Sequence, residues 1–277
     1  MLDALAALLK ALLYVGILSC AGAVFAQATL RPPFDSSHIL SQLIRRGCVL
    51  TICAALASAG CLFIRLGAEF DIATLSAVFL SNTGAAMCLQ IAGAGLLLFG
   101  ASDASTRATQ LSNALLVTAS FAFSGHAAAD GLTAGLVAFL HVSLAAWWFS
   151  SLWVLRDACA RVSSTAVAAL VLRFGSIAFG SVGGLIIAGL VLVATLVDFA
   201  RDPWLSGYGQ WLAVKICIAG VALALASYNK MRLTARLVKA DAAATRSLRR
   251  TISAELVCIG MVLATTAILT TYTSPHE

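Results

Sequence analysis

Residues 174–199 read FGSIAFGSVGGLIIAGLVLVATLVDF, and Asp198, near the end of this stretch, is its only ionisable side chain. A helix advances about 1.5 Å per residue, so about 20 apolar residues cross the hydrocarbon core of a bilayer. Inside lipid, a helix also satisfies its own backbone hydrogen bonds. The stretch therefore predicts a transmembrane helix.

The rest of the chain repeats this pattern. Of its 277 residues, 61% are hydrophobic and 11% are charged, whereas soluble domains carry about 25% charged residues. We predict an all-α, polytopic integral membrane protein, in which an eight-transmembrane-helix bundle forms one membrane domain over 1–277. The expected spans are 11–30, 47–64, 72–99, 111–130, 132–155, 174–199, 207–229 and 252–272.

The distribution of basic residues predicts the orientation of these helices. With eight spans the connecting segments alternate between the two sides, and the cytoplasmic segments of membrane proteins are enriched in Lys and Arg. Most of the 18 Lys and Arg residues fall on one side, while Lys10, Arg65 and Arg201 fall on the other. We therefore expect the cytoplasmic (inner) membrane, with both termini periplasmic.

The net charge of +6 does not predict a nucleic-acid partner, because the basic residues are spread over short segments between apolar runs. We expect the longest basic segment, 230–251, to continue the seventh helix or to lie as a surface helix on anionic lipid headgroups. The partner that the composition indicates is the lipid bilayer.

Two histidines inside the expected spans are the first functional candidates, because ionisable side chains in a membrane are costly. His126 is expected about four residues inside the outer end of the fourth span, with Asp130 one turn further out. His141 lies about nine residues deep in the fifth span. Their depths differ by about 7 or 8 Å at 1.5 Å per residue, which suits successive stations for an ion better than one mononuclear site.

Soft side chains lie at similar expected depths. Cys20, Cys217 and Met261 fall near the depth of His141, and Cys61 falls level with His126. Thiolate, thioether and imidazole groups select Cu(I), whereas hard cations prefer oxygen ligands. Because depth does not show which helix face a residue occupies, packing is the default role for any single Cys or Met, and ligation is the alternative.

Two charged residues lie within the last two spans. Lys215 is about eight residues into the seventh span and has no evident partner, so neutralising an outer carboxylate and acting on an ion path both remain open. Glu255 is about one turn above the inner end of the last span, where we expect Arg173, Asn229 or Lys230 to meet it in a structural role. The depths of Lys215 and Glu255 differ by roughly 10 Å, so we do not expect them to pair.

Catalytic signatures are missing from the sequence, which holds no GxSxG, HExxH or Walker-type motif. The eight cysteines show no CxxC spacing, so disulfides are not expected. We therefore do not expect an enzyme.

Motifs in the last two helices point to a known family. Residues 208–215 read YGQWLAVK, residues 226–230 read ASYNK, and residues 249–255 read RRTISAE. This combination resembles the copper resistance protein D (CopD) family, whose domain has a Tyr-Gly start, a central Lys, an Asn before a basic residue, and paired Arg before a Glu. The sequence SGHA at 124–127 and His141 followed by Trp147 and Trp148 are also similar to that family, so the resemblance covers about 125–271.

The resemblance implies a protein that moves copper ions, or handles them at the periplasmic half of the inner membrane, in copper homeostasis and resistance. It also implies a small CopC-like periplasmic copper-binding protein as a partner. The chain has only four Met and four His, and it has no Met-rich or His-rich outer loop, which argues against high-capacity copper capture by the chain itself.

Two other functions remain open. His126 and His141 could bind haem b in a membrane redox protein, although two ligands of one haem should face each other at matched depth. The chain could also be a non-transporting membrane scaffold for a periplasmic copper protein.

Overall fold

The computed structural model is all-α over the residues that it describes, 1–32, 37–67, 71–100, 106–125, 131–197, 206–239 and 242–273. The first half contains α1 (Leu2–Leu30), α2 (Ser37–Leu66), α3 (Ile72–Phe79), α4 (Asn82–Phe99), α5 (Arg107–Ala119) and the 3-10 turn η2 (Ser120–Phe123). The second half contains α7 (Leu132–Arg161), α8 (Ser164–Leu196), α9 (Gly207–Tyr228), the π-helical segment η4 (Asn229–Leu233), α10 (Thr234–Val238) and α11 (Ala242–Tyr272).

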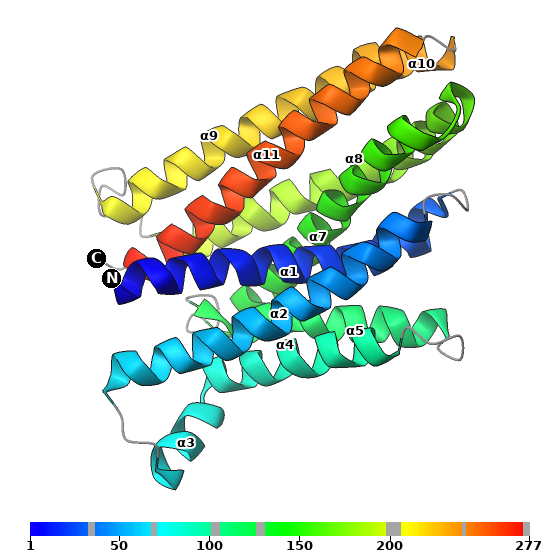
Figure 1. Cartoon of the computed structure of the whole chain (residues 1–277). Helices are drawn as coiled ribbons and strands as arrows, with labels where there is room; N and C mark the ends of the chain where they lie inside the picture. Colours follow the sequence, from blue (N-terminus) through cyan, green and yellow to red (C-terminus); the bar gives the residue numbers. More distant parts are fainter. Residues whose placement is uncertain are drawn as a thin grey trace.

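Helix α1 lies at the centre of the bundle. Figure 1 shows α2, α4 and α5 on one side of it and α8, α9 and α11 on the other, while α7 crosses behind it. The N- and C-termini lie side by side at the same end of the bundle. At that end, Lys10 Nζ donates a hydrogen bond to the Thr270 carbonyl oxygen at 2.7 Å, which joins the first helix to the last.

Glycines allow α1 to approach its neighbours closely. A Cβ atom at Gly22 would lie 2.0 Å from the carbonyl oxygen of Ala146 on α7. A Cβ atom at Gly16 would lie 2.6 Å from the hydroxyl oxygen of Thr51 on α2. Small residues at such crossings bring helix backbones into contact, which is how helices gain packing energy where the hydrophobic effect is absent.

The surface of the bundle is apolar. Among the described residues, seven helices are long and apolar enough to span a membrane: α1, α2, α4, α7, α8, α9 with its continuation to Leu237, and α11. Helix α8 has the highest hydropathy of these, 2.4, yet only 6% of its most apolar stretch is buried inside the protein. Uncovered apolar surface on this scale requires lipid as the solvent, so the chain is a multi-pass membrane protein.

The apolar run expected as one span over 72–99 forms two helices, α3 and α4. The break falls at Ser81, whose hydroxyl oxygen accepts a hydrogen bond from the Gly84 backbone nitrogen at 3.2 Å and so caps α4. A Cβ atom at Gly84 would lie 2.2 Å from the Val78 carbonyl oxygen, so the turn requires glycine there. At the start of α3, hydrogen bonds from the Thr74 side chain and from the Thr74 backbone nitrogen, the latter at 2.7 Å, lower the pKa of the Asp71 carboxyl group.

Other helix ends also differ from the expected spans, because charged and polar residues continue a helix beyond the hydrocarbon core. Helix α1 begins at Leu2 and α2 at Ser37. The expected span 111–130 corresponds to α5 and η2 as far as Phe123, and 126–130 lie outside the described residues. The expected continuation of the seventh helix into the basic segment is confirmed, through η4 and α10 to Val238.

Candidate functional site

His141 lies on α7 and faces α8. Its Cε1 atom is 3.2 Å from the position that a Cβ atom would take at Gly189, so this glycine makes room for the imidazole. The Nδ1 atom is buried and has no hydrogen-bond partner among the described residues. Most buried polar atoms in proteins are hydrogen-bonded, and a free imidazole nitrogen is a ligand for copper and other transition metals. His141 is therefore a metal-ligand candidate with an available donor atom.

Lys215 on α9 lies close enough to His141 for the two side chains to interact electrostatically. The ion pairs of the described residues join Asp3 to Arg65 and Asp157 to Arg161, so no described carboxylate neutralises Lys215. An ammonium group here repels a cation held at His141. The two residues lie at similar depths in the bundle, because His141 is the ninth residue after Leu132 at the start of α7 and Lys215 is the eighth after Gly207 at the start of α9.

The soft ligands expected beside His141 on the last two helices point elsewhere. Met261 is 44% exposed on the surface of α11, and Cys217 is exposed on α9. Cys217 follows Lys215 by two residues, which turns it about 200° around the helix. Cys217 therefore lies on the face of α9 opposite Lys215, on the exposed surface of the bundle.

Cys20 and Cys61 lie on the other side of α7, between α1 and α2. The Cys20 thiol donates to the Ile17 carbonyl oxygen at 3.6 Å and also interacts with Cys48 on α2, while Cys61 Sγ donates to the Leu2 carbonyl oxygen at 3.9 Å. Ser150 Oγ donates to the Leu18 carbonyl oxygen at 2.9 Å, so this part of α1 is level with Ser150. His141 precedes Ser150 by nine residues, or about 13 Å along α7. The structure does not bring Cys20 to the level of His141.

The outermost candidates, His126 and Asp130, lie outside the described residues. Within the described ranges, no three His, Cys, Asp or Glu side chains converge on a point that could hold a metal ion. His141 therefore has no described cluster of ligands around it, which fits a transient ion station better than a permanent metal centre.

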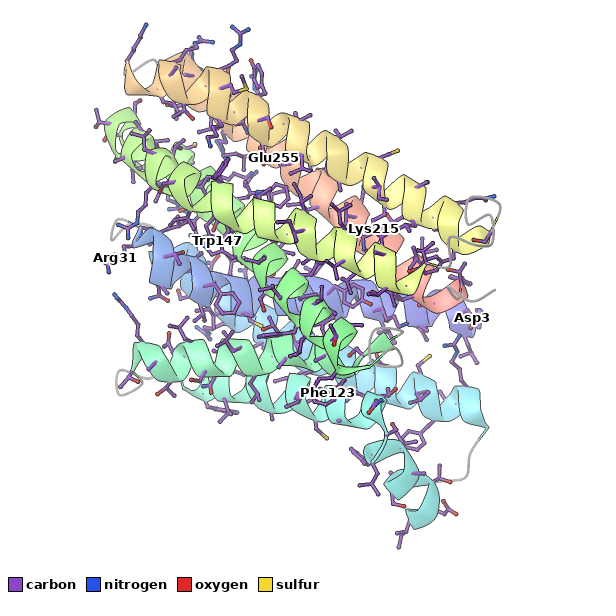
Figure 2. The ribbon with its side chains drawn as sticks, turned by 180° about the vertical axis from the view of Figure 1, so that it is seen from behind. Asp3, Arg31, Phe123, Trp147, Lys215 and Glu255 are labelled. Atoms are coloured by element: carbon purple, nitrogen blue, oxygen red, sulfur yellow. The ribbon has the colours of Figure 1, made fainter. Side chains whose placement is uncertain are left out.

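A second polar site, distinct from His141, lies near the other end of the bundle. Asn229 Nδ2 donates to Glu255 Oε1, and Thr251 Oγ1 donates to Asn229 Oδ1 at 2.6 Å. Glu255 is 1% exposed. Asn229 opens the π-helical segment η4, and such segments are often found at functional sites. Figure 2 shows Glu255 and Lys215 at different positions along the bundle. The described hydrogen bond of Glu255 is with Asn229 and not with Lys215.

Of the three partners expected for Glu255, the structure places Asn229 beside it. Arg173 Nε instead donates to the Thr29 carbonyl oxygen at 2.8 Å, and Lys230 Nζ lies 5.1 Å from the centre of the Phe179 ring. The residues that sequence reasoning missed are Gly189, Cys48 and Thr251. Thr251 carries a signal in the sequence, because it precedes Glu255 by four residues, which puts both on one face of a helix.

Residues 168–269 match the family model described as CopD: Copper resistance protein D. No curated protein and no solved structure matches the chain. The matched region begins in α8 and ends in α11, so it includes Lys215, Asn229 and Glu255 and leaves His141 outside. The expected CopD resemblance is confirmed over these residues, and the chain is a multi-pass membrane protein with a CopD copper resistance domain.

Proposed function

We propose that the protein is a copper transport protein of the inner membrane, which moves copper ions through the periplasmic half of the bilayer in copper homeostasis. The observation that carries the proposal is the match of residues 168–269 to the copper resistance protein D family. Copper is the cargo in this proposal, and the chain catalyses no chemical reaction. A CopC-like periplasmic protein, which the family resemblance implies, is the proposed donor or acceptor of the ion.

The proposal includes eight transmembrane helices. The two termini lie at one end of the bundle, which requires an even number of crossings, and α5 with η2 supplies one more than the seven long helices. These elements have 13 α-helical and 4 3-10 residues. They extend about 27 Å at 1.5 and 2.0 Å per residue, close to the core thickness of about 30 Å.

Basic residues support a cytoplasmic position for the end opposite the termini. Arg31 follows α1, Arg107 begins α5 and Arg161 ends α7, and these helix ends lie away from the termini in Figure 1. Cytoplasmic segments are enriched in Lys and Arg. Both termini are therefore periplasmic in the proposal, and His141 lies in the periplasmic half of the membrane.

His141 is the proposed station for the ion, because its buried Nδ1 atom has no partner among the described residues. His126 and Asp130, which the sequence places nearer the periplasm, are proposed to act before it. Cys217 and Met261 are assigned no role as ligands, since both are exposed on the lipid-facing surface.

The test is copper flux into proteoliposomes, measured beside the metal content and visible spectrum of the purified protein. We expect flux above that of empty liposomes, and a fall of at least tenfold in a His126→Ala/His141→Ala double variant. His38→Ala is the matched control, because His38 is exposed on α2 and contacts Gln42.

Three results would contradict parts of the proposal. Unchanged flux in the double variant would show that the histidines are not the ion path. A Soret band would indicate haem b, which is the redox alternative. Copper binding without flux would indicate a scaffold.

A further inference from the structure

Two cysteines face each other where α1 crosses α2. Cys20 and Cys48 are both 0% exposed, and their thiols interact with each other. A Cβ atom at Gly47 would lie 2.7 Å from the Cys20 backbone nitrogen, so the two helix backbones touch at this crossing. Backbone contact fixes the relative position of the two sulfur atoms more firmly than side-chain packing alone would.

We propose that Cys20 and Cys48 form a two-thiol binding site for a soft monovalent metal ion, Cu(I). Sulfur ligands select Cu(I) among biological metal ions. Among the described residues no third His, Cys, Asp or Glu completes the pair, and zinc sites are almost always four-coordinate. The choice of copper rests on the proposed function, whereas the pairing of the thiols rests on their interaction at the close crossing of α1 and α2.

Other buried cysteines of the chain show what simple packing looks like. Cys61 Sγ donates to a backbone carbonyl oxygen, that of Leu2, at 3.9 Å. Cys258 lies among the apolar side chains of the core. Cys20 Sγ likewise donates to a backbone carbonyl oxygen, that of Ile17, at 3.6 Å. What sets Cys20 apart is its second interaction, with the Cys48 thiol of the neighbouring helix.

Binding exchanges one proton for one copper ion. One cysteine gives up its thiol proton and binds Cu(I) as a thiolate, while the other coordinates through its neutral thiol sulfur. The complex is then uncharged, which matters because an uncompensated charge in a buried apolar site is costly. No electron is transferred, and the proton is released to the solvent.

The two-thiol site is separate from the proposed transport route. Cys20 faces α2, whereas His141 faces α8 at Gly189 and interacts with Lys215 of α9. Loss of the thiols should therefore remove a bound ion and leave flux through the His141 route unchanged.

The test uses the full-length protein in detergent, reduced and kept without oxygen, with Cu(I) titrated against a chromogenic chelator. We expect wild type and Cys258→Ser to bind one tight equivalent at this site, and Cys20→Ser and Cys48→Ser each to lose it. Affinity for Cu(I) should rise about tenfold per pH unit, because one proton leaves for each ion bound. X-ray absorption of the wild-type protein loaded with one equivalent should show two sulfur neighbours around copper.

Equal Cu(I) binding by wild type, Cys20→Ser and Cys48→Ser would overturn the proposal, as would nitrogen or oxygen neighbours in the absorption spectrum. A Cys20–Cys48 disulfide in protein purified under reducing conditions would also overturn it. The absorption measurement needs no variant, so it decides the question even if a serine variant does not fold. If the wild-type protein binds Cu(I) at this pair but shows no flux in liposomes, the proposed function fails and the two-thiol site stands.

Discussion

The two polar sites of the bundle differ in how completely their hydrogen bonds are satisfied. Near the end that carries the termini, the Nδ1 atom of His141 is buried without a partner, and Lys215 beside it forms no ion pair with a described carboxylate. Toward the opposite end, Glu255 accepts a hydrogen bond from Asn229, which in turn accepts one from Thr251. The site at His141 keeps a nitrogen atom that is free to bind a ligand, whereas the polar groups at Glu255 form hydrogen bonds with one another.

This difference in hydrogen bonding indicates a functional role for the site at His141 and a structural role for the site at Glu255. A polar group without a partner costs free energy in an apolar interior, so it persists where a ligand uses it. A satisfied network fixes the positions of the helices that contribute to it. We therefore expect changes near His141 to alter copper transport, and changes near Glu255 to alter stability.

The largest expected effect is at Glu255. Replacing it by alanine removes the acceptor for Asn229 and leaves buried polar groups unsatisfied, so Glu255→Ala should lower the free energy of unfolding by ~3 kcal/mol. Glu255→Gln keeps an oxygen that accepts the hydrogen bond and should lose less than about 1 kcal/mol. Unfolding of the purified variants in mixed micelles measures both, and equal stability of the two would contradict a structural role.

A smaller effect is expected at Lys215. Lys215→Met removes the ammonium group that repels a cation at His141, so the KM for copper flux should fall on the order of tenfold. Lys230→Met is the control, because Lys230 lies over Phe179 and away from His141. A KM that changes equally in both variants would mean that the effect comes from net charge rather than from the site.

The smallest effect is expected at Gly189. A methyl group there would lie 3.2 Å from His141 Cε1 and push the ring aside, so Gly189→Ala should lower copper flux by a few-fold while stability changes by less than about 1 kcal/mol. Gly180→Ala on the same helix is the control, since no atom lies within 4 Å of the added carbon. If both variants transport copper equally, the close contact between Gly189 and His141 does not contribute to transport.

Hydropathy predicted the segments that form the seven long apolar helices, because lipid imposes the same requirement on every spanning helix. It did not predict the turn at Ser81, since a cap inside an apolar run leaves the average hydropathy high. It also placed Cys217 near His141, because depth alone ignores the helix face. Counting about 100° per residue from Lys215 turns Cys217 to the opposite side.

Contacts between helices were predictable only where the chain folds back on itself. Helices α1 and α2 are joined directly, so residues equally far from the shared end meet. Cys20 lies 10 residues before Leu30 and Cys48 lies 11 after Ser37. The sequence predicted that the second helix starts at residue 47 rather than at Ser37, so the similar distances of Cys20 and Cys48 from the shared end were not recognised. The contact of α7 with α8 at Gly189 depends on how helices rotate against one another, which no pattern in a single sequence reveals.

His141 is proposed as a transport station whose loss leaves the fold intact. The most direct test measures copper flux and unfolding on the same preparations of wild type and His141→Ala. We expect at least a tenfold loss of flux with a change in the free energy of unfolding of only about 1 kcal/mol, because the Nδ1 atom makes no hydrogen bond and the substitution removes a single hydrogen bond, that of the ring with the Leu185 backbone. Full flux in His141→Ala would contradict the account, and so would a loss of flux that tracks unfolding.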